Sequence, residues 1–314
     1  MTEATNNPPG PAKRRLACLR RPVLAAGVLA LALVMSACSP RHLLVQGVAD
    51  ELATQAPADE EDLTLLRDAS PFYLKLSESL LKETPGHLKL AQAVSSGFTQ
   101  YAYAFVAFEA EQRAATDARA AHALNDRARR LYLRAQRHAL TALELSSPGL
   151  RQRLMQTPRQ GDAPANVLQP SQVALAYWAA ASWGGYISLS KDDADAVADL
   201  PAVVRLAQWA WNTQPEYGDG ALASLMGTLE AARPGGSSAT AARFFDQAIA
   251  LGQGRSAGPY VAKAEAIALA AGDRPVFEQL LGQALAASAD RRDMTNQVMR
   301  ARAEWLLHTA DDLF

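Results

Sequence analysis

Residues 117–145 read DARAAHALNDRARRLYLRAQRHALTALEL, and their hydrophobic pattern decides the fold class. Apolar residues recur three or four positions apart, which is the period of an α-helix with one apolar face. The stretch therefore predicts one long amphipathic helix. Its apolar stripe consists of Ala118, Ala121, Leu124, Ala128, Leu131, Ala135, Ala139, Ala142 and Leu145.

A second stripe on another face of this predicted helix is basic and consists of Arg127, Arg130, Arg134 and Arg137. Such a stripe can dock an acidic partner or lipid headgroups. More often, a row of like charges is simply the solvated face of a helix, and this is the commoner interpretation. The four arginines are our candidates for partner docking.

The rest of the chain shows the same helical period and no strand-like alternation. The chain has 314 residues, 49% of them hydrophobic and only 7% aromatic, so that most of its apolar content is alanine and leucine. This composition favours helices packed on helices, and we predict an all-α protein. With 31 Lys and Arg against 32 Asp and Glu, the charge gives no reason to expect nucleic-acid binding. Proline and glycine predict helix breaks at 56–57, 84–86, 146–149, 157–170, 214–215, 233–236, 252–259 and 271–273.

Residues 173–189 carry no charged side chain and are apolar on nearly every face. A membrane span is one interpretation. The segment is short, however, and it is rich in alanine, glycine and serine, so a buried helix in a layered helical array is favoured.

The predicted helix over 88–108 has an aromatic face made of Phe98, Tyr101, Phe105 and Phe108, which we expect in the core. Tyr103 points almost opposite to Tyr101, because two residues turn a helix by ~200°. A tyrosine on this second face needs a partner for its hydroxyl, either on a neighbouring helix or at a cavity wall.

Small residues at a fixed spacing predict helical-hairpin repeats. The pattern A-x3-F-x2-A is typical of the second helix of a tetratricopeptide repeat, where small residues allow close packing. Ala241, Phe245 and Ala248 match it, and looser matches start at Ala135, Val203 and Phe277. These starts are separated by about one or two times the ~34-residue period of the repeat. The predicted fold is an all-α solenoid of about four degenerate tetratricopeptide-like hairpins with extra helices at the ends.

The first residues have the pattern of a bacterial export signal. A basic segment precedes the apolar run 23–35, and Ser36-Ala37-Cys38 follows directly. Small residues before a cysteine at this point resemble a lipobox, which implies cleavage before Cys38 and acylation of its thiol. The alternative is an ordinary cleaved signal with a chance cysteine. Ser39 in the second position favours the outer membrane over the inner one.

These patterns divide the chain into three parts. We predict a lipoprotein signal peptide over 1–37, a tether and N-terminal helix over 38–60, and a helical-repeat domain over 61–314. The mature chain would be bound to a bacterial membrane through its lipid anchor, on the periplasmic side.

Motifs for catalysis and metal binding are weak. Residues 254–258 fit G-x-S-x-G around Ser256, but a nucleophile elbow needs a strand before the serine, and helices are predicted on both sides. The five histidines are scattered, and the chain has no H-E-x-x-H, P-loop or Cys/His cluster. We therefore expect neither an enzyme nor a bound metal or cofactor.

Several long segments resemble the T-component (TatT) family of TRAP-transporter-associated lipoproteins. The segments are 70–76 with 80–81, 97–106, 127–132 with 143–145, 177–178, 183–184, 187–193, 198–201, 257–266, 305–307 and 311–314. The resemblance covers about 43–314. It implies an all-helical lipoprotein with cryptic tetratricopeptide repeats that forms a homo-oligomer, with a trimer expected. It also implies docking to a P-component solute receptor and a channel for a hydrophobic ligand. The family supplies no agreed catalytic residues.

Two functions compete at this point. The first is a periplasmic lipoprotein that assists uptake of a small apolar organic acid and holds a ligand in a lumen. The candidate lumen residues are Tyr101, Tyr103, Phe105, Trp178, Trp183 and Tyr186, although core packing is the commoner role of such side chains. The second is a general envelope scaffold that binds a peptide or protein on a helical-repeat surface. A serine hydrolase that uses Ser256 is the weakest alternative.

Overall fold

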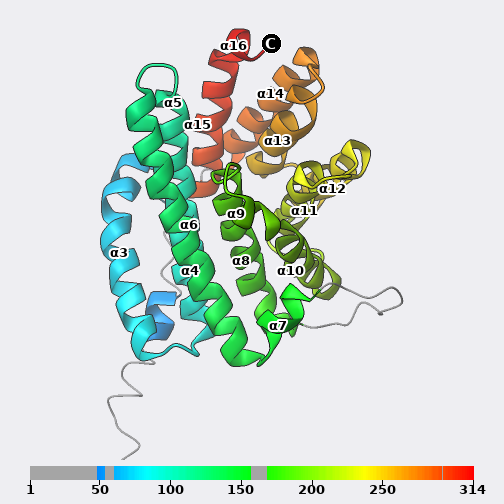
Figure 1. The fold of residues 1–314 in the computed structure, drawn as a ribbon. Helices are drawn as coiled ribbons and strands as arrows, with labels where there is room; N and C mark the ends of the chain where they lie inside the picture. The colour runs from blue at the N-terminus through cyan, green and yellow to red at the C-terminus, as the bar shows by residue number, and fades with distance from the viewer. Residues whose placement is uncertain (1–47, 54–59, 157–167, 292) are drawn as a thin grey trace, which may run out of the picture. The chain divides into compact units, whose positions relative to one another are not determined.

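The computed structural model describes residues 48–53, 60–156, 168–291 and 293–314, and every regular element within them is a helix (Figure 1). The α-helices are α3 (Leu63–Glu83), α4 (Leu88–Ala102), α5 (Phe108–Arg113), α6 (Ala118–Ser146), α7 (Leu150–Met155), α8 (Pro170–Ser188), α9 (Ala194–Ala198), α10 (Leu200–Thr213), α11 (Ala221–Ala232), α12 (Ser238–Leu251), α13 (Ala257–Lys263), α14 (Arg274–Asp290), α15 (Met294–His308) and α16 (Ala310–Leu313). Two further segments are π-helical, η2 (Tyr103–Ala107) and η3 (Ala264–Leu269). The predicted all-α class is confirmed, and the solenoid of repeats stays a prediction.

The helix boundaries follow the predicted proline and glycine breaks. Breaks separate α3 from α4, α6 from α7, α10 from α11, and α11 from α12 at the expected places. The break after α12 is shorter than predicted, because α13 already begins at Ala257. The signal peptide, Cys38 and the break at 56–57 lie outside the described residues.

The long helix predicted from 117–145 is α6. The carboxylate of Asp117 caps its first turn by accepting a hydrogen bond from the Ala120 amide at 2.9 Å. Ala128, Ala135 and Ala139 in the middle of the apolar stripe are fully buried, whereas Leu145 at its end is 55% exposed. The stripe therefore faces the core along most of the helix, against α4 and α8.

The second predicted helix, α8, is buried as expected, with Val173, Ala176 and Ala179 fully shielded from solvent. Within the described ranges, no helix combines the length and hydropathy that crossing a membrane requires.

The repeat pattern at Ala241, Phe245 and Ala248 produces a close helix pair. All three residues are fully buried on α12, which packs on α11. A Cβ at Gly227 of α11 would lie 2.9 Å from the Phe245 ring, so glycine is what allows the two helices to approach. The close packing expected for a hairpin is present in this pair.

Helix α15 contacts both ends of the described array of helices. Successive helices from α10 to α14 pack on one another, and α15 then packs on α13 and α14 and also on α3, near the start of the described chain. In Figure 1, α15 (red) stands between α5 and α14. The buried residues form two clusters, one spanning α3 to α11 and one made by α13, η3, α14 and α15. Residues of α15 therefore face both parts of the array.

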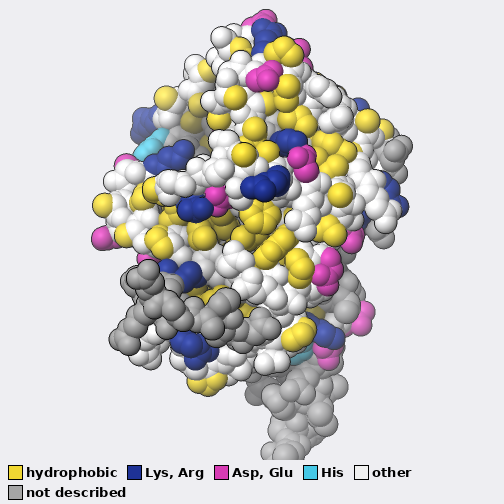
Figure 2. Space-filling model, turned by 90° about the vertical axis from the view of Figure 1, so that its right-hand side faces the viewer, with side chains coloured by type: hydrophobic (Ala, Val, Ile, Leu, Met, Phe, Trp, Pro, Cys, Tyr) yellow, Lys and Arg dark blue, Asp and Glu magenta, His cyan; other side chains and the backbone are white. Residues whose placement is uncertain are grey.

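Apolar side chains also remain on the outside. The outer face of α3 exposes Leu65, Phe72, Tyr73 and Leu76, and Phe72 is 70% exposed. Figure 2 shows a different face, on which apolar side chains form a band with lysine and arginine side chains among them. Exposed apolar stripes of this kind are typical of contact surfaces.

Candidate functional site

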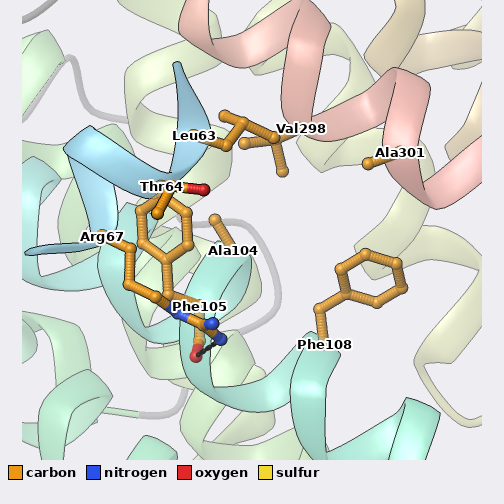
Figure 3. Close-up of a pocket in the computed structure, with 8 residues that line it drawn as sticks. All are labelled: Leu63, Thr64, Arg67, Ala104, Phe105, Phe108, Val298 and Ala301. Atoms are coloured by element: carbon orange, nitrogen blue, oxygen red, sulfur yellow. Dashed lines mark hydrogen bonds between the residues drawn. The ribbon is translucent and has the colours of Figure 1, made fainter.

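A cavity of about 160 Å³ lies where the start of α3, the segment η2 and α15 meet (Figure 3). Its lining residues are Leu63, Thr64, Arg67, Ala104, Phe105, Phe108, Val298 and Ala301. Arg67 is held there by an ion pair with Glu109 at 2.5 Å and by the Phe105 carbonyl, to which it donates a hydrogen bond at 3.4 Å. An apolar cavity of ~150 Å³ binds benzene, so this volume suits one ring or a short alkyl chain.

Phe108 lies beside both this cavity and a buried cation. Its ring lines the cavity, and the centre of the same ring is 5.5 Å from the guanidinium carbon of Arg302 on α15. The side chain of Arg302 is only 8% exposed. The rings of Tyr103 and Trp305 also lie within 6.0 Å of this guanidinium. Three aromatic faces around one cation provide favourable cation–π contacts.

Two carboxylates neutralise Arg302. Its Nε and Nη2 atoms donate to the two oxygens of Glu265 at 3.0 and 2.6 Å, which is a bidentate pair. The Nη2 atom also lies 2.9 Å from Oε2 of Glu111. The remaining nitrogen, Nη1, is buried and has no hydrogen-bond partner among the described residues.

Solvent is largely excluded from Arg302 itself, whereas the side chains of Glu265 and Glu111 are 29% and 40% exposed. Burial raises the pKa of Glu111, against the opposing effect of Arg302. Burial also raises the pKa of the Tyr103 hydroxyl, although the side chain keeps some accessible surface.

The predicted need of Tyr103 for a hydroxyl partner is met only weakly. The hydroxyl lies 4.0 Å from the sulfur of Met299 on α15, and a thioether is a poor acceptor. The side chain thus reaches a neighbouring helix, as the sequence suggested, but finds no strong hydrogen bond there.

The other five lumen candidates are not gathered around Tyr103. Tyr101 and Phe105 are buried with their ring centres 5.5 Å apart, and Phe105 lines the cavity. Trp183 is buried, and its indole donates a hydrogen bond to the Asp199 carboxylate. The Trp178 indole donates to the Tyr217 hydroxyl, and Tyr186 lines a separate surface pocket.

The four arginines of the basic stripe on α6 have different surroundings in the structure. Arg134 donates to both carboxylate oxygens of the buried Glu78 on α3, so it stabilises a helix contact instead of offering an open surface. Arg127 is exposed and lies over the Tyr101 ring at 5.8 Å. Arg130 and Arg137 remain exposed. The Tyr186 pocket, of about 220 Å³, is lined by Asp126, Arg129, Arg130, Leu133 and Tyr186.

Sequence reasoning missed Arg302, Glu111 and Glu265, because they come from three segments far apart in the chain. One signal was present. Arg302 stands four residues after Val298 and four before Leu306, both of which are buried, so a charged residue occupies a core position of the helix. A charge in that position requires paired partners from elsewhere in the fold.

Ser256 lies between two helices, directly before α13, and no strand precedes it in the described ranges. The geometry of a nucleophile elbow is therefore absent at this serine. Within the same ranges, no group of three or more His, Cys, Asp or Glu side chains is placed to hold a metal ion.

Comparison with known proteins agrees with this helical architecture. A profile of the TRAP transporter T-component family matches residues 59–314. An uncharacterized protein of Treponema pallidum (strain Nichols) is 26% identical over 282 residues, which cover 88% of this chain and 87% of that protein. Because the family profile spans most of its length, the chain belongs to the TRAP transporter T-component family.

Proposed function

We propose that this protein is a lipid-anchored accessory component of a TRAP transporter that docks the P-component solute receptor and holds a hydrophobic ligand. Membership of the T-component family implies the role of transporter accessory. The observation that supports ligand binding is the apolar cavity between α3, η2 and α15, with the Arg302 cluster behind Phe108. Small-molecule sites typically combine such an apolar wall with a few polar groups.

The surface that we propose for receptor docking is the exposed part of the basic stripe on α6. Arg130 and Arg137 are exposed, and no ion pair engages either of them within the described residues. Arg130 also borders the Tyr186 pocket, which has room for a carboxylate side chain of a partner. We therefore expect the receptor to present an acidic patch to this face.

Reversing both charges, by Arg130→Glu with Arg137→Glu, is expected to weaken receptor binding by about tenfold or more, since each misplaced charge repels the acidic partner. The protein is cross-linked in intact cells, captured, and its partners are identified by mass spectrometry. The matched control is Arg119→Glu with Arg243→Glu, which changes the net charge equally at two other exposed arginines. Recovery of a TRAP solute receptor with the wild type and the control, but not with the α6 variant, would support the proposal.

A receptor that is recovered equally with both double variants would show that docking uses another face. Recovery of envelope proteins without any solute receptor would favour the general scaffold function instead. Exposed basic residues on a helical array would serve that function equally well.

The membrane anchor and the oligomer are further parts of the proposal. Acylation of Cys38 is expected to keep the protein in the membrane fraction, and Cys38→Ser is expected to release nearly all of it, because the acyl chains supply the membrane affinity. The intact mass of the extracted wild type should exceed that of the polypeptide from Cys38 by the acyl groups.

The native mass of the wild-type protein should correspond to three copies, with the exposed stripe of α3 as our candidate contact surface. An unmodified amino terminus would contradict the proposed lipid anchor, and a monomeric native mass would contradict the proposed trimer.

A further inference from the structure

We infer that the Tyr103 hydroxyl and Nη1 of Arg302 form a polar subsite that binds an uncharged oxygen acceptor of an otherwise apolar ligand. The two groups come from η2 and α15, and the Arg302 guanidinium carbon lies 5.6 Å from the centre of the Tyr103 ring. The inference rests on the proposed ligand-binding function and specifies the chemistry of the ligand.

Both groups have unused hydrogen-bonding capacity. The Arg302 side chain is more than nine-tenths buried, and its Nη1 atom has no hydrogen-bond partner among the described residues. The Tyr103 hydroxyl has only the Met299 sulfur, at 4.0 Å. The aromatic faces around Arg302 stabilise its charge but offer Nη1 no oxygen or nitrogen acceptor, and a buried donor without one is costly. An acceptor supplied from outside the chain would remove this cost.

The chemistry of the two donors selects an acceptor. A guanidinium offers only N–H donors, and a phenol hydroxyl can donate as well. A ketone, ester or ether oxygen between them would receive a hydrogen bond from each side. A few placed polar groups in an otherwise apolar site are a common way to orient a ligand.

The two carboxylates that already pair with Arg302 make binding of a carboxylate ligand unfavourable. Glu265 binds Arg302 through both oxygens, and Glu111 approaches the same guanidinium at 2.9 Å. A third carboxylate would place three negative charges around one cation, which leaves the added charge without a counter-charge.

The side chains beside these donors are apolar. Met299 contacts the Tyr103 hydroxyl, the rings of Phe108 and Trp305 lie beside the Arg302 guanidinium, and Phe108 also lines the cavity of about 160 Å³. Access to Nη1 requires a side chain to move, and methionine is the most adaptable of these neighbours. Tyr103 and Glu265 both lie in π-helical segments, a distortion that recurs at functional sites.

The test compares two probes of equal chain length, octan-2-one and octanoate, by ligand-observed NMR titration. The protein is the mature chain with Cys38→Ser, so that no detergent competes for the probes. Octan-2-one is expected to bind at least about tenfold more tightly than octanoate at neutral pH, because only the ketone avoids charge repulsion. Tyr103→Phe should weaken octan-2-one binding about fivefold and Arg302→Lys about tenfold or more, in line with the loss of one neutral or one charged hydrogen bond.

Tyr260→Phe is the matched control, since it removes a hydroxyl from another half-buried tyrosine, on α13 beside Gly254, and its affinities should equal those of the wild type. Tyr103→Phe removes a single atom with only a weak contact, so it remains informative even if Arg302→Lys folds poorly. Octanoate binding as tight as octan-2-one binding would overturn the inference. Equal octan-2-one binding by wild type, Tyr103→Phe and Arg302→Lys would also overturn it, while leaving ligand binding elsewhere intact. No binding of either probe would overturn the subsite, whereas receptor capture tests the transporter role separately.

Discussion

Adding one methyl group at Gly220, by Gly220→Ala, is expected to lower the free energy of unfolding by about 3 to 5 kcal/mol. Gly220 precedes α11 with φ +97°, a backbone conformation that alanine rarely adopts. A Cβ there would lie 2.3 Å from the carbonyl oxygen of Ala248 in α12. Because this neighbour is backbone, relief requires α11 and α12 to separate, which opens the contact around Phe245. Urea denaturation followed by circular dichroism measures the loss.

Gly272→Ala is the matched control for this prediction. Gly272 has a similar backbone conformation, with φ +68°, but a Cβ there would meet nothing within 4 Å. Its substitution should cost only the conformational penalty, about 1 to 2 kcal/mol. Equal losses in the two variants would mean that the close approach of α11 and α12 contributes nothing to stability.

The second large effect is expected at Glu78, whose side chain is 3% exposed and joins α3 to α6. Arg134 donates to both of its oxygens, Lys75 donates at 2.7 Å, and His138 lies 2.8 Å away. Burial alone would raise the pKa of this carboxyl, but the hydrogen bonds from Arg134, Lys75 and His138 outweigh burial and lower it from 4.5 to about 2. Glu78→Gln is expected to cost about 3 kcal/mol at pH 7, since the cations lose their shared counter-charge.

The stabilisation from Glu78 has a defined pH dependence. The folded-state pKa is depressed, so the contribution is complete above pH 4.5 and declines as the pH falls towards 2, where the folded carboxylate also takes up a proton. The difference in unfolding free energy between wild type and Glu78→Gln should therefore shrink across this window. Glu304→Gln, which removes a half-exposed partner of Arg300, should change stability by less than about 0.5 kcal/mol at any pH in the range. A constant difference from pH 7 to pH 2 would contradict the assigned role of Glu78.

Helix positions were predictable from the sequence because they depend on local signals. The apolar period of α6, the charge-free run of α8 and the proline and glycine breaks all act within a few residues. The small residues around Phe245 likewise predicted a close helix pair, and Gly227 and Gly220 allow it.

The candidate site was less predictable because it depends on long-range contacts. Arg134 and its neighbours on α6 look alike in sequence, and only the position of Glu78 on α3 separates a buried ion pair from an exposed docking residue. The π-helical segments carry no signal that distinguishes them from α-helix in a run of alanines and aromatics. Arg302 meets its partners only once α15 has packed against two other parts of the chain.

The position of α15 has a consequence for the order of assembly. Tyr103 and Met299 are 196 residues apart, so a ribosome completes α15 long after η2. The helices in between can pack on one another first, whereas α3, α13 and α14 complete their contacts only when α15 arrives. Native proteins open locally in cooperative units that often coincide with such packing units. Brief undocking of α15 would expose the Tyr103 hydroxyl to a guest while the remainder of the array stays folded.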